Sequence, residues 1–119
     1  MVEVKKDMAH YCCYCGEINK GSTPSLVFNT NAPLTNIEKL YLTFWQHGTF
    51  VLEKTKDDIV TVDEDTIKLT LTQEETLLFS SKYDVEVQLR IKYNSSNSAA
   101  VTSAISSFKI NEVLKHEVI

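Results

Sequence analysis

The clearest strand pattern in the chain is Tyr83-Asp84-Val85-Glu86-Val87-Gln88-Leu89-Arg90-Ile91-Lys92-Tyr93. Neighbouring side chains of a β-strand point to opposite faces of a sheet, so strict alternation of apolar and polar residues predicts a half-buried strand. The inward side chains are expected to be Val85, Val87, Leu89 and Ile91. The outward side chains are expected to be Asp84, Glu86, Gln88, Arg90 and Lys92.

The same two-residue period recurs along the chain between polar or turn-forming segments. It predicts six further strands, at residues 25–30, 37–46, 49–54, 59–62, 67–71 and 99–110. In the last strand the inward set changes from Val101 and Ile105 to Phe108 and Ile110, which predicts a β-bulge near Ser106-Ser107. Helical character is confined to one turn at residues 73–79.

Seven short antiparallel strands with polar loops predict an all-β sandwich of the immunoglobulin or fibronectin-III type, because two half-apolar sheets bury their inner faces against each other. Three residues resemble the fibronectin-III family, in which a tryptophan of the second strand lies in the core and a leucine and a tyrosine form a corner. The resemblance implies that Trp45 is a core residue. It also implies that Leu77 and Tyr83 form the corner, with the Tyr83 hydroxyl bonded to upstream backbone.

Composition shifts near residue 20, and two regions are expected. Residues 1–19 are charged and then cysteine- and tyrosine-rich, which predicts an N-terminal extension with at most one short strand. Residues 20–119 are assigned to the sandwich domain. Pro24 suits the beginning of its first strand, because proline has no N–H to donate to a sheet.

The distribution of charge argues against nucleic acid partners, and the lack of long apolar runs argues against a membrane partner. Twelve Lys and Arg are scattered among sixteen Asp and Glu, giving a net charge of −4 without a basic stripe. No apolar run approaches the roughly 20 residues of a membrane span, and the first residues lack the apolar segment of a signal peptide. Synthesis in the cytoplasm is therefore expected.

Cys12, Cys13 and Cys15 lie together in the extension, beside His10. An inert role in a reducing compartment is favoured, because a structural zinc site usually takes two ligand pairs from separated parts of a fold. Metal binding and intermolecular or redox disulfide chemistry remain as alternatives. No metal site is assigned to these residues.

No motif predicts catalysis. Gly-x-Ser-x-Gly is absent, the three histidines are far apart in sequence, and His47 beside Gly48 is typical of a turn. The acidic groups at 57–58 and 63–65 lack calcium-loop spacing and are expected to be solvated turns. Tyr41 and Trp45 are expected to be wholly or half buried. The sequence thus predicts a protein that is not an enzyme, with no catalytic, cofactor-binding or metal-binding residues and no cofactor.

Several segments resemble small prophage proteins of Firmicutes that are encoded among tail and baseplate genes, similar in style to the N-terminal domains of baseplate upper proteins. The segments are residues 20–28, 40–48, 69–76, 87–90 and 111–115. The resemblance implies a non-catalytic structural or interaction module of a virion tail or baseplate, located in the virion or the host cytoplasm. Its expected partners are other tail or baseplate proteins, or further copies of itself through an edge strand. The alternative is a sandwich that recognises a cell-wall glycan or calcium.

Overall fold

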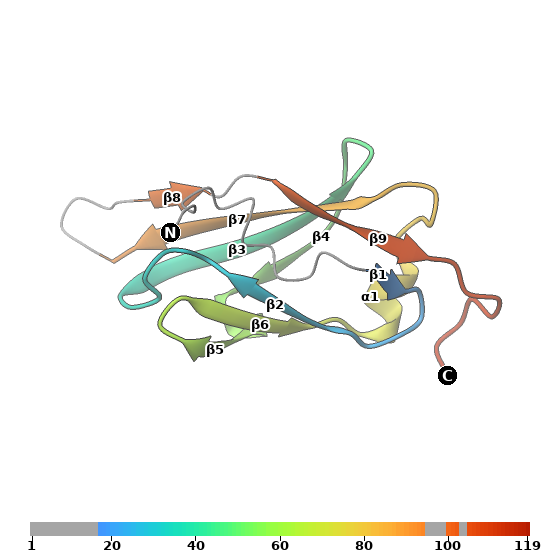
Figure 1. The fold of residues 1–119 in the computed structure, drawn as a ribbon, viewed down its shortest axis with the longest axis horizontal. Coiled ribbons are helices and arrows are strands. Elements are labelled where there is room, and N and C mark those ends of the chain that lie inside the picture. The colour runs from blue at the N-terminus through green and yellow to red at the C-terminus, as the bar shows by residue number, and fades with distance from the viewer. Residues whose placement is uncertain (1–16, 95–99, 103–104) are drawn as a thin grey trace.

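The structure is a computed structural model that describes residues 17–94, 100–102 and 105–119 (Figure 1). His10 and the three cysteines lie outside the described residues, so the predictions made for them stay predictions. The elements are β1 (Glu17–Asn19), β2 (Ser25–Asn29), β3 (Ile37–Gln46), β4 (Thr49–Thr55), the 3-10 helix η2 (Lys56–Asp58), β5 (Ile59–Asp63), β6 (Thr66–Thr70), α1 (Gln73–Leu77), β7 (Val85–Tyr93), β8 (Ala100–Thr102) and β9 (Ser106–Asn111).

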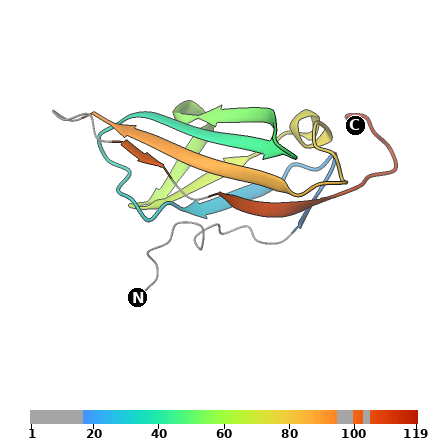
Figure 2. The same ribbon diagram turned by 90° about the horizontal axis from the view of Figure 1, so that it is seen from above.

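Two sheets face each other as a sandwich, as the sequence predicts (Figures 1 and 2). The large sheet has the order β1-β9-β7-β3-β4, with β8 also paired to β7, and the small sheet has the order β2-β6-β5. All pairings are antiparallel except β1 with β9, which is parallel. This division is that of an immunoglobulin-like sandwich, in which strands B, E and D (here β2, β6 and β5) share one sheet and strands C, F and G (here β3, β7 and β9) share the other.

The core lies between the two inner faces, and alternation along each strand supplies it. The four expected inward residues of β7 are all buried, and Leu40, Leu42 and Phe44 of β3 are buried opposite Leu26, Ile67 and Leu69 of the small sheet. Burial of apolar side chains is the main favourable term in folding. The sandwich is therefore held together by side chains that a period of two identifies from the sequence.

The last predicted strand is divided into β8 and β9. Ile91 of β7 lies opposite Val101, whereas Val85 lies opposite Phe108, so the register changes by one residue between the two strands. The predicted change of inward parity is confirmed, with Phe108 and Ile110 buried. The inward prediction for Ile105 is wrong, because this residue lies in the irregular link and its side chain is 55% exposed.

The aromatic residues that suggested a fibronectin-III core are placed differently. Trp45 points away from the core and is 40% exposed, so its core assignment is wrong, and its neighbour Phe44 is the buried aromatic residue of β3. Tyr83 does not form the expected corner. Its ring stacks on His47 with the centroids 4.2 Å apart, and the side chain is 42% exposed.

A buried glutamine holds the corner before β7 instead. The Gln46 Nε2 donates to the carbonyls of Ser80 (2.6 Å) and Tyr83 (2.9 Å), and its Oε1 accepts from the Ser80 N–H (2.7 Å). The Tyr93 hydroxyl, at the far end of β7, donates to the Pro33 carbonyl at 2.6 Å. Side chains that bond to loop backbone in this way satisfy groups that strands leave unpaired.

Candidate functional site

The outer face of the large sheet is the most distinctive surface of the described residues. We use this term for the side chains of β3, β4 and β7 that point away from the small sheet, together with Ile105, which lines a hollow with them. The pairings set them in rows across the sheet: Lys39 with Lys92, Thr55 with Tyr41 and Arg90, Glu53 with Thr43 and Gln88, and Phe50 with Trp45 and Glu86. Each row lies two residues along β3 from the next. The row at Lys39 and Lys92 is cationic, whereas the row at Phe50 and Trp45 is mainly aromatic, so the face has two chemically different ends.

The aromatic end consists of Trp45, Phe50 and Ile105. The rings of Trp45 and Phe50 meet edge to face, with centroids 6.4 Å apart and planes at 86°. Phe50 reaches this position because the register between β3 and β4 shifts between Phe44 and Trp45, as at a β-bulge. The exposed fractions of the three side chains are 40%, 53% and 55% respectively.

A hollow of about 210 Å³ opens beside the ring of Trp45. It is lined by Trp45, Glu86, Val87, Gln88 and Ile105. The outward face of an antiparallel sheet in contact with water is ordinarily polar. Exposed Trp45 and Ile105 around one hollow, with exposed Phe50 against the Trp45 ring, therefore depart from the expected pattern. Glu86 adds a negative charge at the rim of this hollow.

The cationic end lies at the opposite end of β3 and β7 and consists of Lys39, Arg90 and Lys92 around the ring of Tyr41. Lys39 and Lys92 are direct partners across the two strands, and Arg90 is the partner of Tyr41. These residues, with Ile91 and Ala100, line a hollow of about 230 Å³. Like charges placed directly opposite each other destabilise a sheet, so this arrangement has a cost to the fold.

One carboxylate offsets part of this positive charge. The Lys92 ammonium lies 3.8 Å from the Glu38 carboxylate, and both side chains are more than two-fifths exposed. Among the described residues, neither Lys39 nor Arg90 lies within ion-pair distance of a carboxylate. The cationic end therefore carries a net charge of about +2 when one Glu is counted against three cations.

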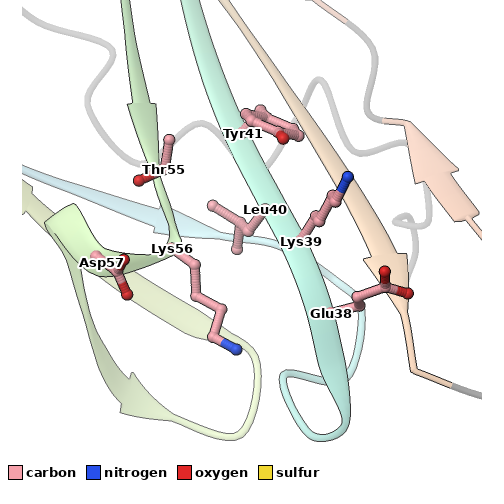
Figure 3. A pocket seen from close by; sticks show the side chains of 7 residues that line it. All are labelled: Glu38, Lys39, Leu40, Tyr41, Thr55, Lys56 and Asp57. Atoms are coloured by element: carbon pink, nitrogen blue, oxygen red, sulfur yellow. The ribbon is translucent and has the colours of Figure 1, made fainter.

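A second hollow, of about 290 Å³, lies on the other side of Tyr41, between β3 and η2 (Figure 3). Figure 3 shows Lys39 and Tyr41 on one side of β3 and Leu40 on the other. The Lys56 ammonium, which lines this hollow, donates to the Ile37 carbonyl at 3.0 Å. Its charge is accordingly engaged with the backbone of the strand.

The acidic segments form turns, as expected. The Asp58 carboxylate accepts from the Thr55 N–H at 2.8 Å, and this bond lowers the pKa of Asp58. The Asp63 carboxylate accepts from the Asp65 N–H at 3.2 Å, which likewise lowers the pKa of Asp63. Within the described ranges no group of three His, Cys, Asp or Glu side chains is placed to hold a metal ion.

His47 lies at the turn between β3 and β4, with φ at 50° and the following Gly48 at 76°. Positive φ at both central residues is the geometry of a tight hairpin turn, so the turn prediction is confirmed. An open hollow of about 430 Å³ beside the stacked His47 and Tyr83 is lined also by Lys82, Asp84, Glu86 and Ser107. The sequence did not predict the contact between His47 and Tyr83, because the two residues are far apart in the chain.

One group of side chains superficially resembles a catalytic triad. The Glu112 carboxylate contacts the His116 Nε2 at 2.8 Å and accepts from the Ser81 hydroxyl at 3.2 Å. In a serine triad the imidazole lies between hydroxyl and carboxylate, whereas here the carboxylate lies between the other two. His116 therefore has no contact through which to take the Ser81 proton. The hydrogen bond between the His116 ring and the Glu112 carboxylate lowers the pKa of Glu112 to about 2.

Comparisons with known proteins describe the fold alone. No protein-family model matches the sequence, and no curated protein matches it. Among solved structures, the V domain of amphioxus IgVJ-C2 is similar, with a TM-score of 0.40 and 10% identity over 80% of this chain and 98% of that one. A chain from a structure of T-cell activation by the bacterial superantigen toxic shock syndrome toxin-1 has a TM-score of 0.48 and 11% identity, over 79% and 90%.

Both scores are low, so the immunoglobulin-like assignment rests on the strand order of the two sheets. The described residues contain no helix that is long and apolar enough to cross a membrane. The sequence predicted which residues share the outer face only in part. Alternation placed Tyr41, Thr43 and Trp45 together on one side of their strand, but it did not show that this side is exposed.

Proposed function

We propose that this chain is a non-catalytic interaction module that docks a neighbouring protein subunit on the aromatic end of its outer face. The observation that carries the proposal is the joint exposure of Trp45 and Ile105 around one hollow, with the exposed ring of Phe50 against Trp45. Tryptophan and other large aromatic residues contribute a disproportionate share of binding energy in protein interfaces. A flat sheet face with such residues suits a partner that covers it.

The chemistry of the hollow indicates what the partner presents. An aliphatic or aromatic side chain fits against Trp45 and Ile105, since both flank an apolar depression of about 210 Å³. Glu86 at the rim favours a Lys or Arg beside that side chain, because opposite charges at an interface fix its register. The expected partner surface is therefore an apolar anchor with an adjacent positive charge.

The setting that we propose is a virion tail or baseplate. Support for it comes from the resemblance of residues 20–28, 40–48, 69–76, 87–90 and 111–115 to small prophage proteins. In that setting the partner is another tail or baseplate subunit, and the protein acts in the virion or in the host cell during assembly. Immunoglobulin-like sandwiches serve many unrelated functions, so the fold itself adds no support for this choice.

The test measures binding of the full chain to each tail and baseplate subunit encoded beside it, by biolayer interferometry. We expect Trp45→Ala together with Ile105→Ser to weaken binding at least about tenfold, equivalent to about 1.4 kcal/mol. The matched control is Val62→Ser, which removes an exposed apolar side chain from β5 of the small sheet and should leave binding unchanged. Absence of binding to every neighbouring subunit would overturn the proposal.

Light scattering after size-exclusion chromatography covers the case of a second copy as the partner. A dimer that Trp45→Ala disrupts and Val62→Ser retains would replace the neighbouring subunit by this chain itself. That result would overturn the choice of partner but keep the docking face. A dimer that both variants retain would place self-association elsewhere.

Recognition of a cell-wall glycan is the second candidate, favoured by the exposed ring of Trp45, because aromatic faces pack against sugar rings. A glycan array separates it from protein docking, since specific glycan binding that Trp45→Ala abolishes would favour this candidate. The calcium form of the alternative lacks support in the described ranges, because the Asp58 and Asp63 carboxylates already accept turn hydrogen bonds.

A further inference from the structure

We propose that the cationic end of the outer face is a binding site for a phosphate group. The site consists of Lys39, Arg90 and Lys92 around Tyr41, and it lies at the opposite end of β3 and β7 from the aromatic end. The proposal does not depend on the docking function, because no residue is shared between the two hollows.

The first argument is the placement of charge. The whole chain has a net charge of −4, yet its single arginine and two of its lysines gather within two adjacent rows of one sheet. Lys39 and Lys92 are direct cross-strand partners, and like charges in this position destabilise a sheet, an effect that Glu38 offsets only in part. A bound anion converts this repulsion into two attractive contacts.

The second argument is the shape of the site. A hollow of about 230 Å³ lies among the three cations, and Tyr41, Ile91 and Ala100 complete its lining. Tyr41 is half-buried and Ile91 is buried, so part of this lining is fixed by the packing of the sheet. An anion in the hollow is shielded from water on that side, which strengthens its contacts with the cations.

The third argument is the match between the available donors and phosphate. An arginine guanidinium binds phosphate through two parallel N–H bonds, and lysine ammonium groups act as mobile point charges. Lys92 is partly neutralised by Glu38 at 3.8 Å, which leaves about +2 at the site. A phosphate monoester carries about −1.5 to −2 near pH 7, so the two charges balance.

Nucleic acid is a poor fit for the same site. A polynucleotide backbone gains affinity by contacting a series of cations along its length. Here the neighbouring row contains Glu53, Thr43 and Gln88, and the row beyond it contains Glu86. On the other side of Tyr41 lies Lys56 (Figure 3), whose ammonium already donates to the Ile37 carbonyl. The positive charge is therefore local, as a single phosphate group requires.

The experiment titrates the full ¹⁵N-labelled chain with inorganic phosphate at constant ionic strength, using sodium chloride to balance it. We expect saturable amide shifts confined to residues 39–41 and 90–92. Arg90→Gln should raise the dissociation constant at least about tenfold, because it removes the two-bond contact. The matched control, Lys68→Gln, removes an exposed cation from β6 of the small sheet and should leave the titration unchanged.

Shifts that grow linearly without saturation would overturn the proposal, as would equal losses in Arg90→Gln and Lys68→Gln. Trp45→Ala distinguishes this proposal from the docking function. The variant should lose binding to a protein subunit but should bind phosphate as the parent chain does. A chain that binds phosphate but no protein subunit would retain this site and lose only the proposed docking role.

A second titration with glucose 1-phosphate identifies the source of the phosphate. Tighter binding of the sugar ester than of inorganic phosphate, with the gain lost in Tyr41→Leu, would indicate that a sugar ring packs on Tyr41. Equal binding of the two compounds would indicate a site for the phosphate group alone. Absence of saturable binding for both compounds would contradict the proposal outright.

Discussion

The inner and outer faces of β3 and β7 share one backbone ladder but differ in what their side chains do. The inner face, with Leu42 and Phe44 as examples, is buried and apolar over most of its length. The outer face changes over six residues of β3 from a cationic end at Lys39 to an aromatic end at Trp45. The comparison teaches that packing dictates one face of these strands and leaves the other available for binding.

The largest expected effect separates the two faces at adjacent residues. Phe44 is fully buried and packs near Phe79, with ring centroids 6.2 Å apart. Phe44→Ala should lower the free energy of unfolding by about 3–5 kcal/mol, because it leaves a cavity in the core. Trp45→Ala should cost only about 0.5–1 kcal/mol, from loss of its cross-strand pair with Phe50. Urea unfolding followed by circular dichroism measures both, and similar losses would contradict the division into two faces.

The sequence could predict the inner face but only part of the outer one. Alternation identified Val85, Val87 and Leu89 as buried because burial on one side leaves a direct record in residue type. The resemblance to the fibronectin-III family misplaced Trp45, because a large aromatic residue suits a core and a binding surface equally well. Alternation thus shows which residues share a face and leaves open whether that face is covered.

The cationic end was beyond sequence reasoning for a different reason. Lys39 and Lys92 are far apart in the chain and become partners only through the register of β3 with β7. That register shifts between Ile37 and Lys39, and a shift of one residue exchanges the two faces. Polar residues carry no periodic signal that fixes such a shift, so the grouping of charges required the structure.

The next effect concerns the end of β3, where a polar residue lies on the inner face. Gln46→Met keeps the volume but leaves the Ser80 N–H and carbonyl without their side-chain partner. The expected loss in the free energy of unfolding is about 2–3 kcal/mol, since unsatisfied buried polar groups are costly. Lys68→Met is the control, a change from a polar to an apolar side chain on the exposed face of β6, and it should change stability by less than about 0.5 kcal/mol. Equal losses would show that the corner before β7 does not depend on Gln46.

A smaller, pH-dependent effect comes from an inward lysine of β4. Lys54 forms an ion pair with Glu75 of α1, and the Glu75 carboxylate also accepts from the Thr72 N–H at 2.9 Å. Partial burial raises the pKa of Glu75, but the hydrogen bonds from Lys54 and Thr72 outweigh it and bring the pKa below its usual value. The lowered pKa means that the stabilisation is complete above about pH 4.5 and is lost as the pH falls through the folded-state pKa.

Urea unfolding between pH 3 and pH 6 measures this effect. Glu75→Gln should flatten the fall in stability on acidification, because the variant has no carboxylate to protonate. Glu74→Gln removes the same charge from the exposed side of the same helix without removing the ion pair, and it should keep the fall. If both variants retain the acid dependence of the parent chain, the Lys54 pair contributes nothing to it.

The smallest expected effect has the opposite sign and distinguishes a binding face from an ordinary surface. Lys39→Thr removes one member of the repulsive cross-strand pair and places a β-branched residue in a strand. In chloride buffer it should raise the free energy of unfolding by about 0.2–1 kcal/mol. Phosphate should then stabilise the parent chain more than the variant, because only the parent keeps all three cations. Thermal unfolding with and without phosphate measures the stability difference in chloride and the stabilisation by phosphate. If the variant is less stable than the parent in chloride, Lys39 stabilises the fold. The outer face at this end would then contribute to stability, as the inner face does.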